Sequence, residues 1–479
     1  MYAETVLQVN FEDAQKLFLE HLLEIHYAHT LMLARAGIMP REVARICLRG
    51  LDGLDREGIR AARYDGRTED LFFYVERELE RACGAENSGW MHTARSRNDI
   101  DITLYRLRLR RDILRLLGNL NGARHAVLSL AHEHALTLMP AYTHTQPAQP
   151  ITFGHYLAGF AEMLERDAGR LEAAFRTVNR CPLGACAIAT TGFPIDRAYT
   201  AGLLCFDGLQ LNSYGAIAAT DYLTETAGAV ATAMTGLGRV AQDFLLWCTA
   251  EFGYLRLSDA WVQISSIMPQ KRNPVPFEHV RALASKSLGQ AQAVFLGLHN
   301  TPWGDTNDAE DDLQPTMAGV IHDAVRALRI FGAVLPDMQV NVARMRERAH
   351  ADFLTVTELA DVLVRREGMS FREAHGFVSA TVKELGGDSS HAAIADTLAR
   401  RLGARVKITS REDLLRALDP EEFVSSRRIP GGPGAEALEP ALRDLDDGLV
   451  AGDISLDVAR NELGRMQERI RVARRDLQV

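Results

Sequence analysis

The chain has 479 residues, of which 47% are hydrophobic, and it carries a formal net charge of −9. This length and apolar content predict a large buried core divided among two or three domains. The negative charge argues against a nucleic acid or an anionic membrane surface as a partner. No stretch approaches the roughly 18 uninterrupted apolar residues of a membrane span.

The first residues, Met-Tyr-Ala-Glu-Thr-Val-Leu, contain no basic segment followed by an apolar run, so we expect no signal peptide and a cytoplasmic protein. Six cysteines are scattered without a Cys-x-x-Cys pair or nearby ligand histidines. They are typical of buried free thiols, and we expect no metal site.

Helical periodicity dominates the sequence and predicts an all-α fold. Residues 1–95 carry short helical patterns separated by turn residues such as Gly37 and Pro40. Long helical patterns follow at residues 101–137, 153–178, 215–250 and 275–298, and the patterns shorten again after about residue 345. We therefore predict an N-terminal helical domain (1–95), a central helix-bundle domain (96–345) and a C-terminal helical domain (346–479).

The central helical patterns are longer than the roughly dozen residues of an average helix, and they are rich in small side chains. The Ala227-Gly228-Ala229 cluster, for example, allows helices to approach closely. Long, weakly amphipathic helices are hard to cover within one subunit. We therefore expect an oligomeric bundle.

A first polar segment, Met-His-Thr-Ala-Arg-Ser-Arg-Asn-Asp, occupies residues 91–99 just before the first long helical pattern. Free N–H groups at a helix start attract anions, and arginine adds fork-shaped donors. Arg97 and Asn98 are therefore candidate ligands of a carboxylate. An ordinary helix cap with solvated arginines is the alternative.

A second segment, residues 139–150, has three prolines in Met-Pro-Ala-Tyr-Thr-His-Thr-Gln-Pro-Ala-Gln-Pro, which predicts a rigid connection between two helices. Its His144 can hold a proton at neutral pH, whereas most histidines are surface or capping residues. Thr143 precedes it as a candidate substrate ligand.

The most informative segment is Ser-Ser-Ile-Met-Pro-Gln-Lys-Arg-Asn-Pro at residues 265–274, a polar loop bounded by prolines inside a helical pattern. Lys271 offers a point charge for a carboxylate. Glu278, seven residues after Lys271, starts the next helical pattern and could instead be a solvated helix-start residue. The loop's candidate side chains are Ser265, Ser266, Gln270, Lys271 and Asn273.

These three segments, in this order, resemble the three signatures of the fumarase/aspartase superfamily, whose members eliminate fumarate from substituted succinates. The string His-Thr-Ala-Arg-Ser-Arg-Asn-Asp is similar to that of argininosuccinate lyases, as are Pro182-Leu183-Gly184 with Phe193-Pro194-Ile195-Asp196-Arg197 and the segment between Thr355 and His375. The Gln-Pro-Ala-Gln-Pro form of the second segment leans toward adenylosuccinate lyases.

The resemblance implies a three-domain fold whose long helices form a tetrameric core, with each active site shared by three subunits. It implies a dicarboxylate substrate, no cofactor and a reversible anti β-elimination from an N-substituted aspartate. Ser265 resembles the catalytic base, and His144 paired with Glu278 resembles the second catalytic group. Lys271 and Asn273 would stabilise the aci-carboxylate. Arg97, Asn98, Thr143, Ser266 and Gln270 would bind the substrate.

The sequence departs from argininosuccinate lyases where those enzymes hold the amine. Their Tyr…Gln…Lys series is replaced by Trp-Gly-Asp-Thr-Asn-Asp-Ala-Glu-Asp-Asp at residues 303–312, while His26 and Phe72 stand where that family has Ser and His. An acidic loop suits a cationic amine or diamine, although its acids could simply be solvated. Argininosuccinate lyase, an adenylosuccinate-type lyase and a catalytically silent crystallin-like oligomer remain the alternatives.

Overall fold

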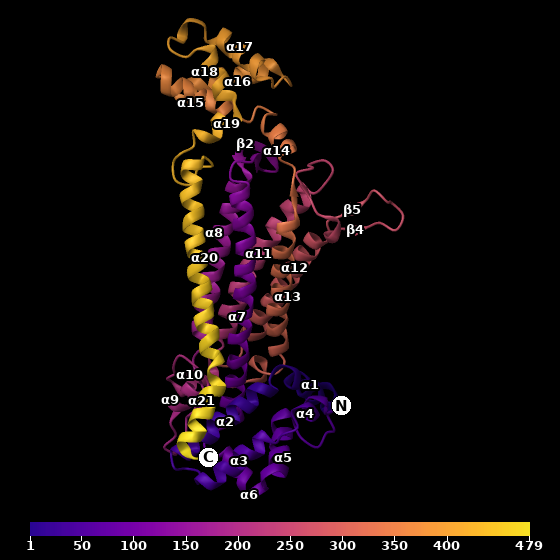
Figure 1. Cartoon of the computed structure of the whole chain (residues 1–479), viewed down its shortest axis with the longest axis vertical. Helices are drawn as coiled ribbons and strands as arrows, with labels where there is room; N and C mark the ends of the chain where they lie inside the picture. The colour runs from indigo at the N-terminus through magenta and orange to yellow at the C-terminus, as the bar shows by residue number, and fades with distance from the viewer.

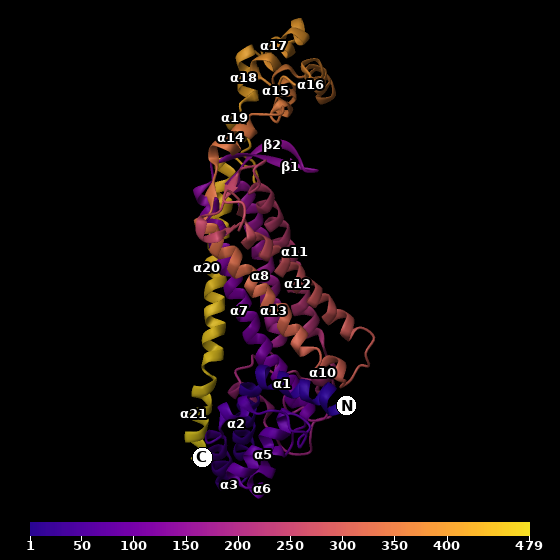
Figure 2. The same ribbon diagram turned by 90° about the vertical axis from the view of Figure 1, so that its right-hand side faces the viewer.

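The computed structural model describes residues 1–479 and is elongated, with a helical module at each end of a bundle of long helices (Figures 1 and 2). Helices account for nearly all of the regular structure, which confirms the all-α fold expected from the periodicity. None of these helices combines the length and the hydropathy needed to cross a membrane.

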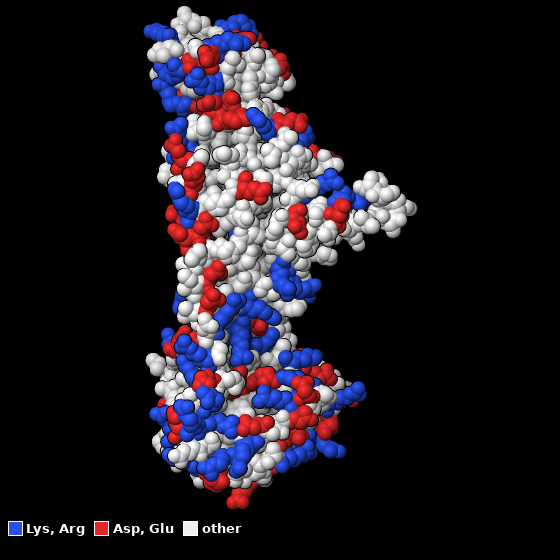
Figure 3. Space-filling model, viewed as in Figure 1, with Lys and Arg blue, Asp and Glu red and all other residues white.

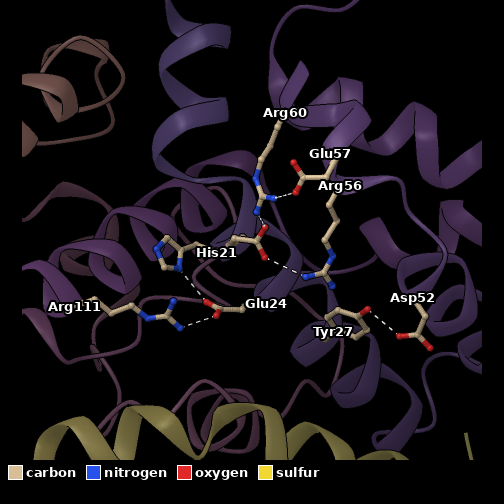
Figure 4. A network of polar contacts seen from close by, with 9 residues as sticks. His21, Glu24, Tyr27, Asp52, Arg56, Glu57, Arg60 and Arg111 are labelled. Atoms are coloured by element: carbon tan, nitrogen blue, oxygen red, sulfur yellow. Dashed lines mark hydrogen bonds and ion pairs between the residues drawn. The ribbon is translucent and has the colours of Figure 1, made fainter. Parts of the chain in front are cut away.

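The N-terminal module consists of α1 (Gln8–Leu17), α2 (Leu19–Arg35), α3 (Arg41–Asp52), α4 (Arg56–Ala61), α5 (Leu71–Cys83) and α6 (Ala85–Ser88). Polar side chains of α2 join it to its neighbours (Figure 4). Glu24 accepts hydrogen bonds from His21 at 3.0 Å and from Arg111 of the first long helix at 2.6 Å. Tyr27 donates to Asp52 of α3 at 2.9 Å. These contacts fix the module against the lower end of the bundle.

The central bundle contains α7 (Arg97–Glu133), α8 (Phe153–Val178), α9 (Arg197–Leu203), α10 (Ser213–Ala218), α11 (Asp221–Trp247), α12 (Val275–Leu298) and α13 (Gln314–Val334). The predicted ranges 153–178 and 275–298 coincide with α8 and α12. The pattern at 215–250 divides into α10 and α11, which are separated at Ala219 and Thr220. One continuous apolar core runs through these helices and the N-terminal module.

Six short strands form three antiparallel pairs: β1 (Leu138–Thr143) with β2 (Gln146–Thr152), β3 (Leu255–Arg256) with β6 (Gln339–Val340), and β4 (Gln263–Ile264) with β5 (Arg272–Asn273). The β1–β2 hairpin lies at the upper end of the bundle, and the β4–β5 ribbon projects sideways from it (Figure 1). Both ribbons carry polar segments that were singled out in the sequence.

The C-terminal part contains α14 (Val342–Ala349), α15 (Val356–Glu367), α16 (Phe371–Leu385), α17 (His391–Leu402), α18 (Arg411–Leu418), α19 (Pro420–Ser425), α20 (Ala435–Gly464) and α21 (Met466–Leu477). Helices α15 to α18 enclose a small apolar core of their own at the upper end.

Helices α20 and α21 return along the whole bundle to the N-terminal module (Figure 1). Leu438, Leu442, Leu445 and Leu449 form an apolar stripe on α20 that is part of the main core. The domain boundaries near 95 and 346 stay predictions. They did not include this return, which makes residues 435–477 part of the central packing.

Candidate active site

The 91–99 segment is clamped to the start of α7 by a buried carboxylate. Asp99 accepts the backbone N–H of Ser96 at 2.9 Å in a capping box, and its second oxygen accepts those of Gly184 at 2.7 Å and Cys186 at 2.9 Å. Burial raises the pKa of Asp99 to about 6, although these three N–H donors oppose the shift. The Pro-Leu-Gly segment at 182–184 therefore serves to position the lower end of α7.

Arg95 is buried beneath this segment and donates to His26 Nδ1 at 3.0 Å and to Glu76 at 3.1 Å. The His26 ring stacks on Phe72, with 6.2 Å between ring centroids. Burial, with help from Arg95, lowers the pKa of His26 well below its usual value, so this ring is neutral. The two sequence departures at His26 and Phe72 thus meet in the core. Both side chains lie beside Arg95.

Arg97 and Asn98 face an acidic surface. Arg97 Nη2 lies 2.7 Å from Asp70 and 3.5 Å from Asp101. The Asn98 amide donates to Asp305 at 2.6 Å. The 303–312 loop, which was singled out in the sequence for its charge, therefore lies directly beside two predicted substrate ligands.

A cavity of about 250 Å³ opens between residues 2–10 at the N-terminus, the segment just before α5, the start of α7 and the 303–312 loop. Arg97 is the only basic residue among those that line it. The acidic residues that line it are Glu69, Asp70, Asp101, Asp305, Glu310, Asp311 and Asp312. Sequence reasoning identified the loop acids but missed Asp101 of α7, because a single Asp in a helical pattern carries no distinguishing signal.

Thr143 and His144 lie at the exposed tip of the β1–β2 hairpin, where Thr143 pairs with Gln146. His144 and Thr145 form the two-residue turn, with φ of 51° and 60°. Both values lie in the left-handed region, which is costly for residues with a side chain and especially for a β-branched one. The expected rigid connection is thus a strained tight turn that presents the His144 side chain outward.

Ser265 opens the loop between β4 and β5, and its Oγ accepts the backbone N–H of Ile267 at 3.3 Å and of Met268 at 3.0 Å. Two donors aimed at one hydroxyl oxygen favour its anionic form. This geometry is chemically suited to a serine that acts as a base. Ser266, Gln270 and Lys271 are exposed around it.

The base of this ribbon is fixed by Arg272, which donates to the Leu257 carbonyl at 2.9 Å and forms an ion pair with Asp259. Asn273 pairs with Gln263 across the ribbon. Glu278 lies exposed in the first turn of α12. No hydrogen bond or ion pair joins Glu278 to another side chain, so its pairing with His144 stays a prediction.

Within one chain the three segments lie far apart. Arg97 begins α7 at the lower end of the bundle, whereas the hairpin with His144 follows its upper end (Figure 1). A helix of 37 residues is about 55 Å long. The Ser265 ribbon projects separately (Figure 1). A single chain therefore brings together Arg97 with Asn98, Thr143 with His144, and the loop residues with one another, but it does not bring the three groups together.

Comparisons with known proteins agree with this arrangement of signatures. Residues 20–289 match the family described as Lyase, and residues 353–425 match the argininosuccinate lyase C-terminal family. The chain is 40% identical to argininosuccinate lyase 2 of Agrobacterium fabrum over 92% of this chain and 89% of that protein. It is 36% identical to argininosuccinate lyase 1 of Shouchella clausii over 94% and 92% of the two chains.

Among solved structures, a variant of EDDS lyase with bound fumarate superposes with a TM-score of 0.89 at 31% identity, over 98% of this chain and 95% of that one. The long-helix bundle, the ordered signatures and these matches place the chain in the lyase family of the fumarase/aspartase superfamily. Within that superfamily it is an argininosuccinate lyase-like carbon–nitrogen lyase that releases fumarate.

Proposed function

We propose that the protein catalyses the reversible anti β-elimination of fumarate from an N-substituted aspartate, with Ser265 as the base. The observation that carries this proposal is the pair of N–H groups directed at Ser265 Oγ, at 3.0 and 3.3 Å, beside the exposed Lys271. Donors to an oxygen that must become anionic lower the cost of forming the alkoxide.

In the proposed reaction, Ser265 removes a proton from the carbon next to a carboxylate, and the electron pair enters that carboxylate as an aci-carboxylate. Lys271 and Asn273 stabilise the charge that develops there. The C–N bond then breaks, and the amine leaves with a proton. His144, held by Glu278, is the candidate to supply that proton or to orient the substrate.

The separation of the signatures within one chain supports a site that is built from several chains. We propose a homotetramer in which one subunit supplies Arg97 and Asn98, another Thr143 and His144, and a third the Ser265 loop with Gln270 and Ser266. The face of the central helices carries few charges compared with the N-terminal module (Figure 3). Small or apolar side chains exposed on α11 and α12 would suit close helix packing between copies: Thr232, Thr235, Ala282, Ser285, Gly289, Ala293 and Leu296.

The relatives named above favour argininosuccinate as the substrate, whereas the acidic 303–312 loop favours a different amine. We propose a relative of argininosuccinate lyase that acts on another adduct, of a diamine or an aminopolycarboxylate. The neighbouring EDDS lyase structure supports this extension of the substrate class.

Ultraviolet detection of fumarate, formed from argininosuccinate and from a panel of N-substituted aspartates that includes ethylenediamine adducts, tests the proposal. We expect fumarate from the diamine adducts at rates at least about tenfold above those from argininosuccinate. Turnover of argininosuccinate at the highest rate of the panel would overturn the altered specificity. A folded oligomer that forms no fumarate from any adduct would overturn the proposed activity itself.

A further inference from the structure

The acidic cavity contains a carboxylate that lacks the partners a buried charge needs. Asp101 of α7 is only 9% exposed and lines the cavity. Its Oδ2 lies 3.5 Å from Arg97 Nη2, and no donor forms a hydrogen bond with either of its oxygens. A buried carboxylate without close donors is unfavourable, so this group calls for a cation in the adjoining space.

Arg97, the cation nearest to Asp101, also pairs with a second carboxylate. Arg97 makes its short contact, 2.7 Å, with Asp70. Asp101 and Asp70 therefore share the single positive charge of Arg97, which lies 3.5 Å from Asp101. Burial raises the pKa of Asp101 well above its usual range. Arg97 opposes this shift, whereas Asp311, Asp70 and Asp305 add to it.

The 303–312 loop adds further acidic groups to the cavity. Asp311 is held by Tyr105 at 3.2 Å and by Asn10 at 3.3 Å, both neutral donors. Burial and the facing Asp305 carboxyl raise the pKa of Glu310 to about 9. Carboxyl groups from α7 and from the 303–312 loop thus converge on one space in which Arg97 is the only basic side chain.

The cavity adjoins the proposed substrate ligands, because Asp305 accepts the Asn98 amide at 2.6 Å. We propose that the cavity binds an ammonium group at the far end of the leaving amine, with Asp101 as its principal partner, so that the enzyme prefers diamine adducts of fumarate. This inference rests on the proposed lyase function and names the amine class of that same site. The distal end of argininosuccinate carries an α-carboxylate beside its α-ammonium group, and this wall of acids repels that carboxylate.

The amine-addition direction gives a direct test, because fumarate disappears as an amine N–H adds across its double bond. Three amines of similar size differ at the far end: ethylenediamine with an ammonium, propylamine with a methyl group and β-alanine with a carboxylate. Each is assayed with wild type, with Asp101→Asn and with the matched control Asp308→Asn. Asp308 lies in the adjoining 303–312 loop but does not line the cavity.

The ratio of variant to wild-type kcat/KM cancels the intrinsic reactivity of each amine. We expect Asp101→Asn to lower kcat/KM about tenfold or more for ethylenediamine and less than about twofold for propylamine. For β-alanine we expect no loss, and Asp308→Asn should match wild type throughout. Equal losses with all three amines, or no loss with ethylenediamine, would overturn the assignment of Asp101.

A binding readout separates this inference from the proposed reaction. If wild type consumes fumarate with none of the three amines and forms none from the adducts of the earlier panel, the lyase proposal fails. Thermal unfolding with ethylenediamine alone then tests whether the cavity binds a diammonium ion. A rise in Tm with wild type that is absent with Asp101→Asn supports a diammonium site. No rise with wild type overturns it.

Discussion

Glu310 lies beside Asp305 in the lining of the acidic cavity, and its titration should be visible in the stability of the unliganded protein. Its folded-state pKa is about 9, because it is buried against another carboxyl group. In the unfolded chain a Glu ionises near pH ~4.3. Between these values the folded state holds more protons than the unfolded state, so stability falls as the pH rises.

Glu310→Gln removes this titration. We expect the Tm of wild type to fall between pH 5 and pH 9, and the variant to show a shallower fall with a higher Tm at the alkaline end. Circular dichroism melts at pH 5, 7 and 9 measure both slopes. Asp308→Asn, which changes the same loop by one charge outside the cavity, should follow wild type. Equal slopes for Glu310→Gln and wild type would contradict the raised pKa.

Among the elements, the joint between the 182–197 segment and α7 depends on one glycine. Gly184 has φ of 89°, and its N–H donates to Asp99. An added Cβ would lie 2.6 Å from Arg197 Cγ and 3.0 Å from Ile195 Cδ1. Both the backbone conformation and the space therefore require glycine here.

We expect Gly184→Ala to lower the free energy of unfolding by about 2–4 kcal/mol, from backbone strain and overpacking together. Chemical denaturation gives the value. Gly192→Ala is the matched control, because its φ is ordinary and nothing lies within 4 Å of the added Cβ. It should stay within about 0.5 kcal/mol of wild type. A Gly184→Ala protein as stable as the control would contradict the requirement for glycine at this joint.

Periodicity predicted the elements best where a helix packs with one continuous face, as α8 and α12 do. Periodicity could not predict that α20 returns along α7, because an apolar stripe shows which face of a helix is buried but not which helix packs against it. For a similar reason, the sequence indicated only those acidic residues of the cavity that belong to the 303–312 loop. The carboxylates of the cavity come from the segment just before α5, from α7 and from the 303–312 loop, and only folding makes them neighbours.

At the scale of the whole molecule, the length of α7 decides how an active site can form. Arg97 and the His144 hairpin lie at opposite ends of a helix about 55 Å long, so they can serve one reaction only when different copies place opposite ends together. The same reasoning applies to the Ser265 ribbon, which projects sideways from the bundle (Figure 1). In the proposed tetramer, a chain that lacks one group would therefore disable different sites from those that a chain lacking another group would disable.

Mixed oligomers of two inactive variants test whether the active sites are shared between subunits. Arg97→Ala and Ser265→Ala should each abolish turnover, with a loss of at least about 100-fold. Chains of the two variants, unfolded together in equal amounts and refolded, should regain about a quarter of the wild-type activity. This is because a site that draws the two groups from different random subunits is intact one time in four.

Ser265→Ala mixed with Lys271→Ala is the matched control. Both changes lie on the same loop, so no site can regain an intact loop and activity should stay at background. Recovery in the control, or none in the first mixture despite mixed oligomers by mass spectrometry, would exclude sites shared between subunits.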